Sequence, residues 1–157
     1  MTTEITVLAW GCVLAFVHIF AAAQAKTQQY GVKWNMGARD EALPPPDPVA
    51  GRLVRAQANF FETFPIAAAS VLMLAVSGLG SATTATGAWL WLGCRIIYLP
   101  LYAAGVPMLR TIIFLASIVG IGMMVGPMLS PSHADPGKSL QFLKPHLPLL
   151  RDRAAMK

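Results

Sequence analysis

Four polar residues recur at helical spacing in a segment that is otherwise apolar. Arg52, Arg55, Asn59 and Glu62 are separated by three, four and three residues, so they share one face of a helix. We call this face the polar stripe. Gln57 lies off the polar stripe and is expected to point toward a neighbouring helix or subunit.

A second polar set follows further along the chain. Arg95, Tyr98 and Tyr102 are spaced by three and four residues, and Arg110 and Thr111 open the next apolar segment. A charge at the centre of a bilayer costs at least about 2.5–3.5 kcal/mol on insertion scales. Charged residues in such segments therefore need partners.

Two explanations fit these buried charges. Interhelical ion pairs, such as Glu62 with Arg95, would fix the register of the helices. That explanation requires one carboxylate for each arginine, whereas residues 52–129 contain four arginines and one glutamate. The excess of positive charge favours an anionic ligand, above all one whose carboxylates can accept paired hydrogen bonds from arginine.

The composition indicates that the elements carrying these residues lie in a membrane. Apolar residues make up 55% of the chain, charged residues 12%, and the mean hydropathy is +0.56. A soluble domain would have about a quarter of its residues charged. The length of 157 residues allows one domain.

Four apolar segments are each close to the length of about 20 residues that crosses a bilayer. They predict an all-α, four-helix transmembrane domain over residues 1–130, with helices at 5–25, 52–76, 85–104 and 109–129. Residues 131–157 form a proline-rich basic tail, whose leucines suit either the bilayer surface or a membrane protein partner. Since no Lys or Arg precedes the first segment, we interpret it as a retained helix and not as a signal peptide.

The basic residues near the helix ends predict the orientation. Lys26, Lys33, Arg39 and Arg52 belong to the first connection or border it, and Arg110 is expected at the same end. Cytoplasmic loops carry an excess of Lys and Arg. The first connection is therefore predicted to be cytoplasmic, with both termini on the opposite side.

Other features predict no additional chemistry. The net charge of +5 lacks the basic, aromatic-rich surface of a nucleic-acid-binding protein and suits anionic lipid headgroups instead. Cys12 and Cys94 lie in separate apolar segments, so no disulfide and no metal site is predicted. His18 has no second metal ligand at helical spacing and is expected to pack or to bond between helices. Gly122 and Gly126 form a GxxxG motif, which is typical of close helix packing.

The segment from Arg52 to Pro65, with its Arg-x-x-x-Asn-x-x-Glu core, closely resembles the signature of the MAPEG family of membrane-associated proteins in eicosanoid and glutathione metabolism. Arg95-x-x-Tyr98-x-x-x-Tyr102 followed by Arg110 resembles the family's pattern in its third and fourth helices. The resemblance covers about residues 5–129. It is greatest to the bacterial branch, related to microsomal glutathione transferases, which implies a bacterial inner-membrane location.

The resemblance implies a homotrimer that binds glutathione as a co-substrate between adjacent subunits. Position by position, it implies that the ligand is bound by polar residues of the second and third helices: Arg52, Arg55, Gln57, Asn59, Glu62, Arg95, Tyr98 and Tyr102. Arg110 matches the arginine beside the glutathione sulfur, and Thr111 stands near the thiol. Thr63 replaces an aromatic hydroxyl of several members, which removes one possible ligand contact.

The chemistry of glutathione is consistent with this residue set. Glutathione carries two carboxylates and one ammonium group, and a guanidinium beside its sulfur favours the nucleophilic thiolate. The sequence thus predicts a glutathione transferase or peroxidase that acts on an apolar small-molecule electrophile from the bilayer. The alternative is a non-catalytic accessory subunit of a larger membrane complex, for which the unusual tail argues.

Overall fold

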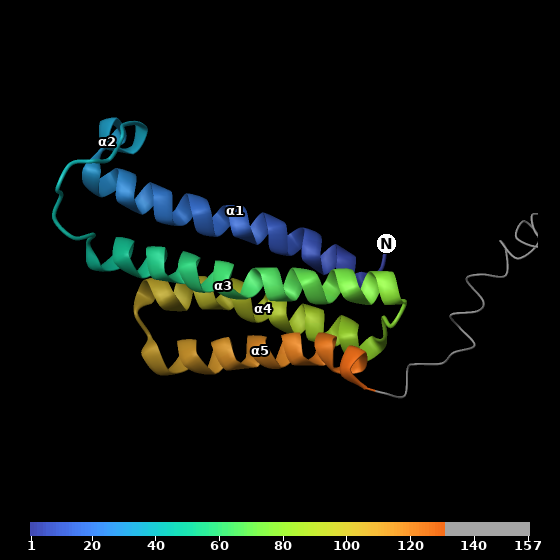
Figure 1. The fold of residues 1–157 in the computed structure, drawn as a ribbon. Helices are drawn as coiled ribbons and strands as arrows, with labels where there is room; N and C mark the ends of the chain where they lie inside the picture. The colour runs from blue at the N-terminus through green and yellow to red at the C-terminus, as the bar shows by residue number, and fades with distance from the viewer. Residues whose placement is uncertain (131–157) are drawn as a thin grey trace, which may run out of the picture. The chain divides into compact units, whose positions relative to one another are not determined.

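The computed structural model describes residues 1–130, and its regular structure is helical throughout. Four long helices run along one another: α1 (Thr3–Tyr30), α3 (Pro48–Ser77), α4 (Ala82–Ala104) and α5 (Pro107–Leu129) (Figure 1). A short helix, α2 (Val32–Met36), lies between α1 and α3. The all-α prediction is confirmed for these residues, and the predicted tail lies outside them.

All four long helices begin before their predicted starts, and α1 and α3 extend furthest beyond their predicted bounds. α1 continues past its predicted end at residue 25 to Tyr30, and α3 begins at Pro48, four residues before its predicted start. Proline suits the first helical position, because its fixed φ is helical and its missing N–H would have no partner there. The five-residue α2 was not predicted, since it is too short for a periodic pattern.

Within residues 1–130, three helices are long and apolar enough to cross a membrane by length and composition, namely α1, α3 and α5. α4 does not meet this criterion. Its 23 residues match a span in length, but they include Arg95 and several tryptophans and tyrosines, which lower the hydropathy. The fourth span therefore stays a prediction.

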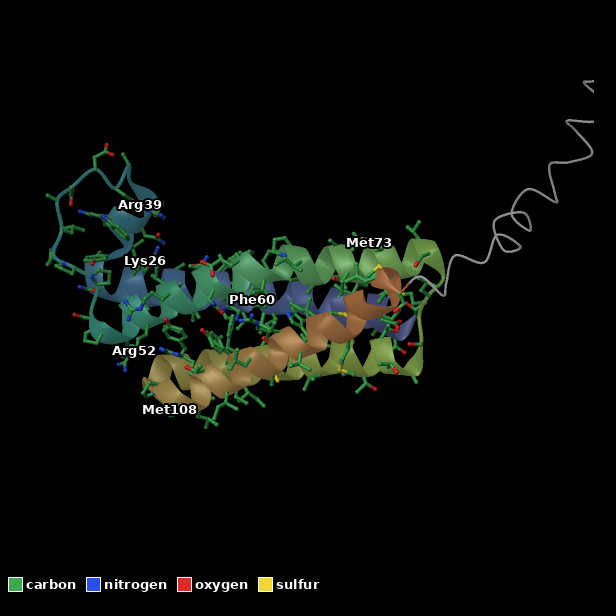
Figure 2. The ribbon with its side chains drawn as sticks, turned by 60° about the horizontal axis from the view of Figure 1, so that its bottom comes forward. Lys26, Arg39, Arg52, Phe60, Met73 and Met108 are labelled. Carbon is green, nitrogen blue, oxygen red and sulfur yellow. The ribbon has the colours of Figure 1, made fainter. Side chains whose placement is uncertain are left out.

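α1, α3 and α4 all pack against one another. Their shared interior is aromatic: Phe60 of α3 lies between the helices (Figure 2) and stacks on His18 with 4.5 Å between ring centroids. Phe64 and Trp91 continue the cluster. The packing role expected of His18 is thus confirmed, and neither of its ring nitrogens has a hydrogen-bond partner among the described residues.

α5 crosses α4 at a pair of glycines. A Cβ atom on Gly120 would lie 2.6 Å from the carbonyl oxygen of Gly87, and one on Gly87 would lie 2.7 Å from that of Gly120. The predicted GxxxG motif of Gly122 and Gly126 is not what makes this contact, since a Cβ on Gly122 would meet nothing within 4 Å. Close packing by the GxxxG motif stays a prediction.

The connection between α1 and α3 is fastened to the last turn of α1. Gln29 donates to the carbonyl of Pro45 (3.1 Å) and accepts from the backbone N–H of Asp47 (2.7 Å). The Tyr30 hydroxyl donates to the carbonyl of Pro44 at 2.7 Å. These bonds fix where α3 starts, and hence the positions of the arginines in its first turns.

Candidate functional site

Arg95 is the centre of the polar residues in the bundle. It lies on α4 and is fully buried. Its Nη1 donates to Oδ1 of Asn59 and its Nη2 to Oγ1 of Thr63, each at 2.7 Å. Its Nε has no partner among the described residues. A buried guanidinium is thus held by neutral oxygens from α3, which leaves its charge uncompensated.

The ion pair considered from the sequence is not what holds this guanidinium. Both hydrogen bonds that Arg95 makes within residues 1–130 go to neutral side chains. Glu62 is exposed, although it remains within electrostatic range of Arg95 and of Tyr98. The site therefore has an unpaired cation in its interior and a carboxylate at its edge.

Aromatic rings continue the site from Arg95 toward the α4–α5 turn. The Arg95 guanidinium carbon lies 5.4 Å from the ring centroid of Tyr98 and 5.1 Å from that of Phe114 on α5. Tyr98 packs edge-on to Tyr102 at 5.3 Å. Arg110 stacks on Tyr102 at 4.4 Å. We call the series Arg95, Tyr98, Tyr102 and Arg110 the polar column.

Arg52 joins the outer end of the polar column. Its guanidinium lies against Gly105, at the turn between α4 and α5, and its Nε donates to the Pro48 carbonyl at 3.1 Å. Gly105 has a φ of 78°, a left-handed conformation that disfavours side chains, and a Cβ there would collide with Arg52. The tight turn thus brings Arg52 of α3 to the end of α4.

Four other predicted site residues are not brought into these contacts in the described part of the chain. Arg55 and Glu62 are exposed on α3, and Gln57 is half-buried. Thr111 is exposed, and its hydroxyl donates to the Pro107 carbonyl of its own helix at 3.0 Å. The polar stripe is therefore divided: Asn59 turns inward to Arg95, while Arg55 and Glu62 lie at the surface of the bundle.

Sequence reasoning missed two residues of this site. Thr63 had been interpreted as the loss of a ligand contact, yet its hydroxyl is a partner of Arg95. The sequence could have indicated this role, because Thr63 follows Asn59 by four residues and residues i and i+4 share a helix face. In the sequence, Phe114 cannot be distinguished from a lipid-facing residue, and no pattern predicts its contact with Arg95.

Chemically, the polar column can bind anions and hold them next to aromatic hydroxyls. Guanidinium groups at its two ends are separated by two tyrosines, and Arg110 is within electrostatic range of Tyr98. Among residues 1–130, no group of three or more His, Cys, Asp or Glu side chains could hold a metal ion. The arrangement suits a ligand with carboxylates.

Comparison with known proteins identifies the family. A search of curated proteins found no match to the chain. A family model described as the MAPEG family matches residues 7–129, most of the chain, and so the chain belongs to the MAPEG family.

Proposed function

We propose that this chain is a membrane glutathione transferase or peroxidase that activates the thiol of glutathione for attack on apolar electrophiles or hydroperoxides. The MAPEG family includes glutathione transferases. The polar column, with arginines at both ends, supports an anionic co-substrate of this kind.

The observation that carries the proposal is the environment of Arg95. A fully buried guanidinium bound to neutral oxygens is costly in a medium of low dielectric constant. A carboxylate of glutathione would supply the missing negative charge, and an arginine fork suits a carboxylate well. The exposed Glu62 is suited to the ammonium group of the same ligand.

In this proposal Arg110 stabilises the thiolate. A free thiol has a pKa of about 8.5 and is mostly protonated at neutral pH. A guanidinium held beside the sulfur favours the charged form, which is the nucleophile. Tyr102 holds Arg110 through its ring face, so the cation is oriented before the ligand arrives.

The proposal includes a homotrimer with glutathione bound between subunits. Arg55 and Glu62 are exposed on the protomer, so a neighbouring copy would complete the site and remove both charges from lipid. We also propose four spans and a cytoplasmic α1–α3 connection. Lys26, Arg39 and Arg52 lie at the same end of the bundle (Figure 2), as positive residues do on the cytoplasmic side.

The test is an Arg110→Ala substitution. Thiolate absorbance is titrated against pH with saturating glutathione, beside a conjugation assay with an apolar model electrophile. We expect Arg110→Ala to keep most glutathione binding and to lose thiolate formation and turnover. Arg39→Ala is the matched control, because Arg39 also stacks on an aromatic ring, that of Trp34, but in the connection.

Each other outcome contradicts part of the proposal. Unchanged thiolate formation in Arg110→Ala would move this role to another group, such as Tyr98 or Thr111. Absence of both thiolate and turnover in the wild type would reject an enzyme and favour the accessory-subunit alternative.

A further inference from the structure

Three buried side chains in the interior of the bundle have polar atoms that no described residue satisfies. His18 of α1 and Trp91 and Arg95 of α4 are each at most 2% exposed. Both ring nitrogens of His18, Nε1 of Trp91 and Nε of Arg95 have no hydrogen-bond partner within residues 1–130. The large majority of buried side-chain polar atoms in proteins are bonded to protein or to ordered water. These four atoms therefore require an explanation.

The three side chains converge around Phe60 of α3, which lies between the helices (Figure 2). The ring centroid of Phe60 is 4.5 Å from that of His18 and 6.3 Å from that of Trp91. Arg95 follows Trp91 by four residues, so the two project from the same face of α4. The Arg95 guanidinium bonds to Asn59, the residue before Phe60, and lies within electrostatic range of His18. The four atoms thus lie at one level of the bundle.

The donors and acceptors of these atoms do not balance. The Nε–H of Arg95 and the Nε1–H of Trp91 can only donate. A second cation close to Arg95 would be repelled strongly in a medium of low dielectric constant, so the His18 imidazole is neutral and offers one donor and one acceptor. Direct bonds among the three side chains would leave two of these three donors unpaired. What the cluster lacks is an acceptor that can serve more than one donor.

We propose that one buried water joins His18 to Arg95 and Trp91, and that His18 is thereby a positioning residue for Arg95. The water accepts from Arg95 Nε–H and Trp91 Nε1–H and donates to the unprotonated nitrogen of His18. Three such bonds are typical of a buried water. Asn59 and Thr63 bind the two Nη atoms of Arg95, so the water on Nε completes the support of the guanidinium plane.

This role rests on the proposed function, in which Arg95 offers its charge to a carboxylate of glutathione. Each Nη atom of Arg95 carries two N–H groups, and one of each pair is used within the bundle. The remaining N–H of each pair is left for the ligand. A carboxylate is bound best by N–H groups that are fixed in one plane before it arrives. His18 acts on the ligand through this orientation and not by contact.

The experiment separates the hydrogen bonds of His18 from its ring stacking. His18→Phe keeps a ring that stacks on Phe60 and removes both nitrogens, whereas His18→Gln keeps a donor and an acceptor and removes the ring. Glutathione affinity is measured by calorimetry, and stability as the midpoint of thermal unfolding in detergent. We expect His18→Phe to bind glutathione about tenfold more weakly, which corresponds to about 1.4 kcal/mol, and to have a lower midpoint. His18→Gln should bind glutathione like the wild type.

A double-mutant cycle tests whether His18 and Trp91 share one water. Trp91→Phe keeps an aromatic ring and removes a donor to the water, so it should lower the midpoint of the wild type. In the His18→Phe background the water is already lost, and Trp91→Phe should then have little or no effect. Trp89→Phe is the matched control, because Trp89 lies on the exposed face of α4; its effect should be the same in both backgrounds.

Each arm has a result that would overturn the proposal. Wild-type glutathione affinity in His18→Phe would reject the positioning role, and reduced affinity in His18→Gln alone would assign His18 to stacking. A midpoint of His18→Phe at or above that of the wild type would exclude the water, since a phenyl ring should stabilise a site where the imidazole has no partner. Additive midpoints of His18→Phe and Trp91→Phe would exclude a shared water. A wild type that does not bind glutathione would reject the proposed function, and the midpoints would still decide whether the water is present.

Discussion

The partners of Arg95 make single-residue predictions possible. Thr63→Val keeps the shape of the side chain and removes the hydroxyl that accepts from Arg95 Nη2. A buried charged donor then loses a partner, which costs about 1–3 kcal/mol. We expect a lower midpoint of thermal unfolding in detergent, followed by tryptophan fluorescence.

Thr86→Val is the matched control for this substitution. Thr86 lies on α4, is exposed, and donates to the carbonyl of Ala82 in its own helix. Its loss should leave the midpoint unchanged. Equal stability of Thr63→Val and Thr86→Val would mean that the Arg95–Thr63 bond contributes no net stability.

Tyr102 provides a second residue-scale prediction, because its ring face and not its hydroxyl contacts Arg110. Tyr102→Phe keeps the ring and should retain most conjugation activity. Tyr102→Leu removes it and frees Arg110 to move, so activity should fall by about tenfold if a contact of about 1.4 kcal/mol is lost in the transition state. Equal loss in both variants would instead assign a role to the phenolic hydroxyl.

At this scale the sequence predicts which faces are polar, but not which neighbour each residue meets. Helical spacing grouped Asn59 with Arg55 and Glu62, because positions three and four apart share a face. A helix face is broad, however, and α4 contacts only its inner edge. Asn59 and Thr63 therefore bind Arg95, while Arg55 and Glu62 lie at the surface.

At the scale of the helices, the crossing of α4 and α5 predicts opposite effects on stability for two glycine-to-alanine substitutions in α5. Gly120→Ala would place a Cβ against the backbone of α4, 2.6 Å from the Gly87 carbonyl and 2.8 Å from the Trp91 nitrogen. The helices must separate, which typically costs about 1–3 kcal/mol. A lower midpoint of thermal unfolding is expected.

Gly122→Ala tests the same chemistry on the open face of α5. A Cβ there meets nothing within 4 Å, and alanine is favoured over glycine in a helix by up to about 1 kcal/mol. Its midpoint should match or exceed that of the wild type. A destabilised Gly122→Ala together with a neutral Gly120→Ala would contradict the observed rotation of α5.

The connection between α1 and α3 can be tested through Gln29, which bonds both Pro45 and Asp47. Gln29→Ala removes two hydrogen bonds, each worth about 0.5–1.5 kcal/mol. The connection should open more often, and trypsin should cut faster after Lys33 and Arg39. Gln28→Ala, the exposed neighbour, should be cut at the wild-type rate; equal rates in both variants would mean that Gln29 does not fasten the connection.

The helices themselves were largely predictable, because long apolar segments leave little choice of structure. Their ends and the connection were not. The start of α3 at Pro48 depends on bonds from Gln29 and Tyr30, sixteen and fourteen residues from their partners. Contacts over such separations leave no periodic signal in the sequence.

At the scale of the whole molecule, family membership and three apolar helices make the chain an integral membrane protein. Arg55 and Glu62 then lie on the surface of the bundle, seven residues or about 10 Å apart along α3. A charge in the hydrocarbon costs at least about 2.5–3.5 kcal/mol. An association that turns this surface away from lipid is therefore favoured.

The last prediction is a homotrimer that depends on this surface. Native mass spectrometry from mild detergent should give the mass of three copies. Glu62→Arg would leave only positive charge on the polar stripe, so repulsion between stripes should increase the monomer fraction. Glu41→Arg makes the same change in the exposed connection and should leave the trimer intact, which separates a local effect from one of net charge. Equal dissociation of the two variants would contradict the role of this surface, because net charge alone would then explain the effect. A monomeric wild type would contradict the homotrimer itself, because the exposed charges of α3 would then be accommodated in the bilayer without a second copy.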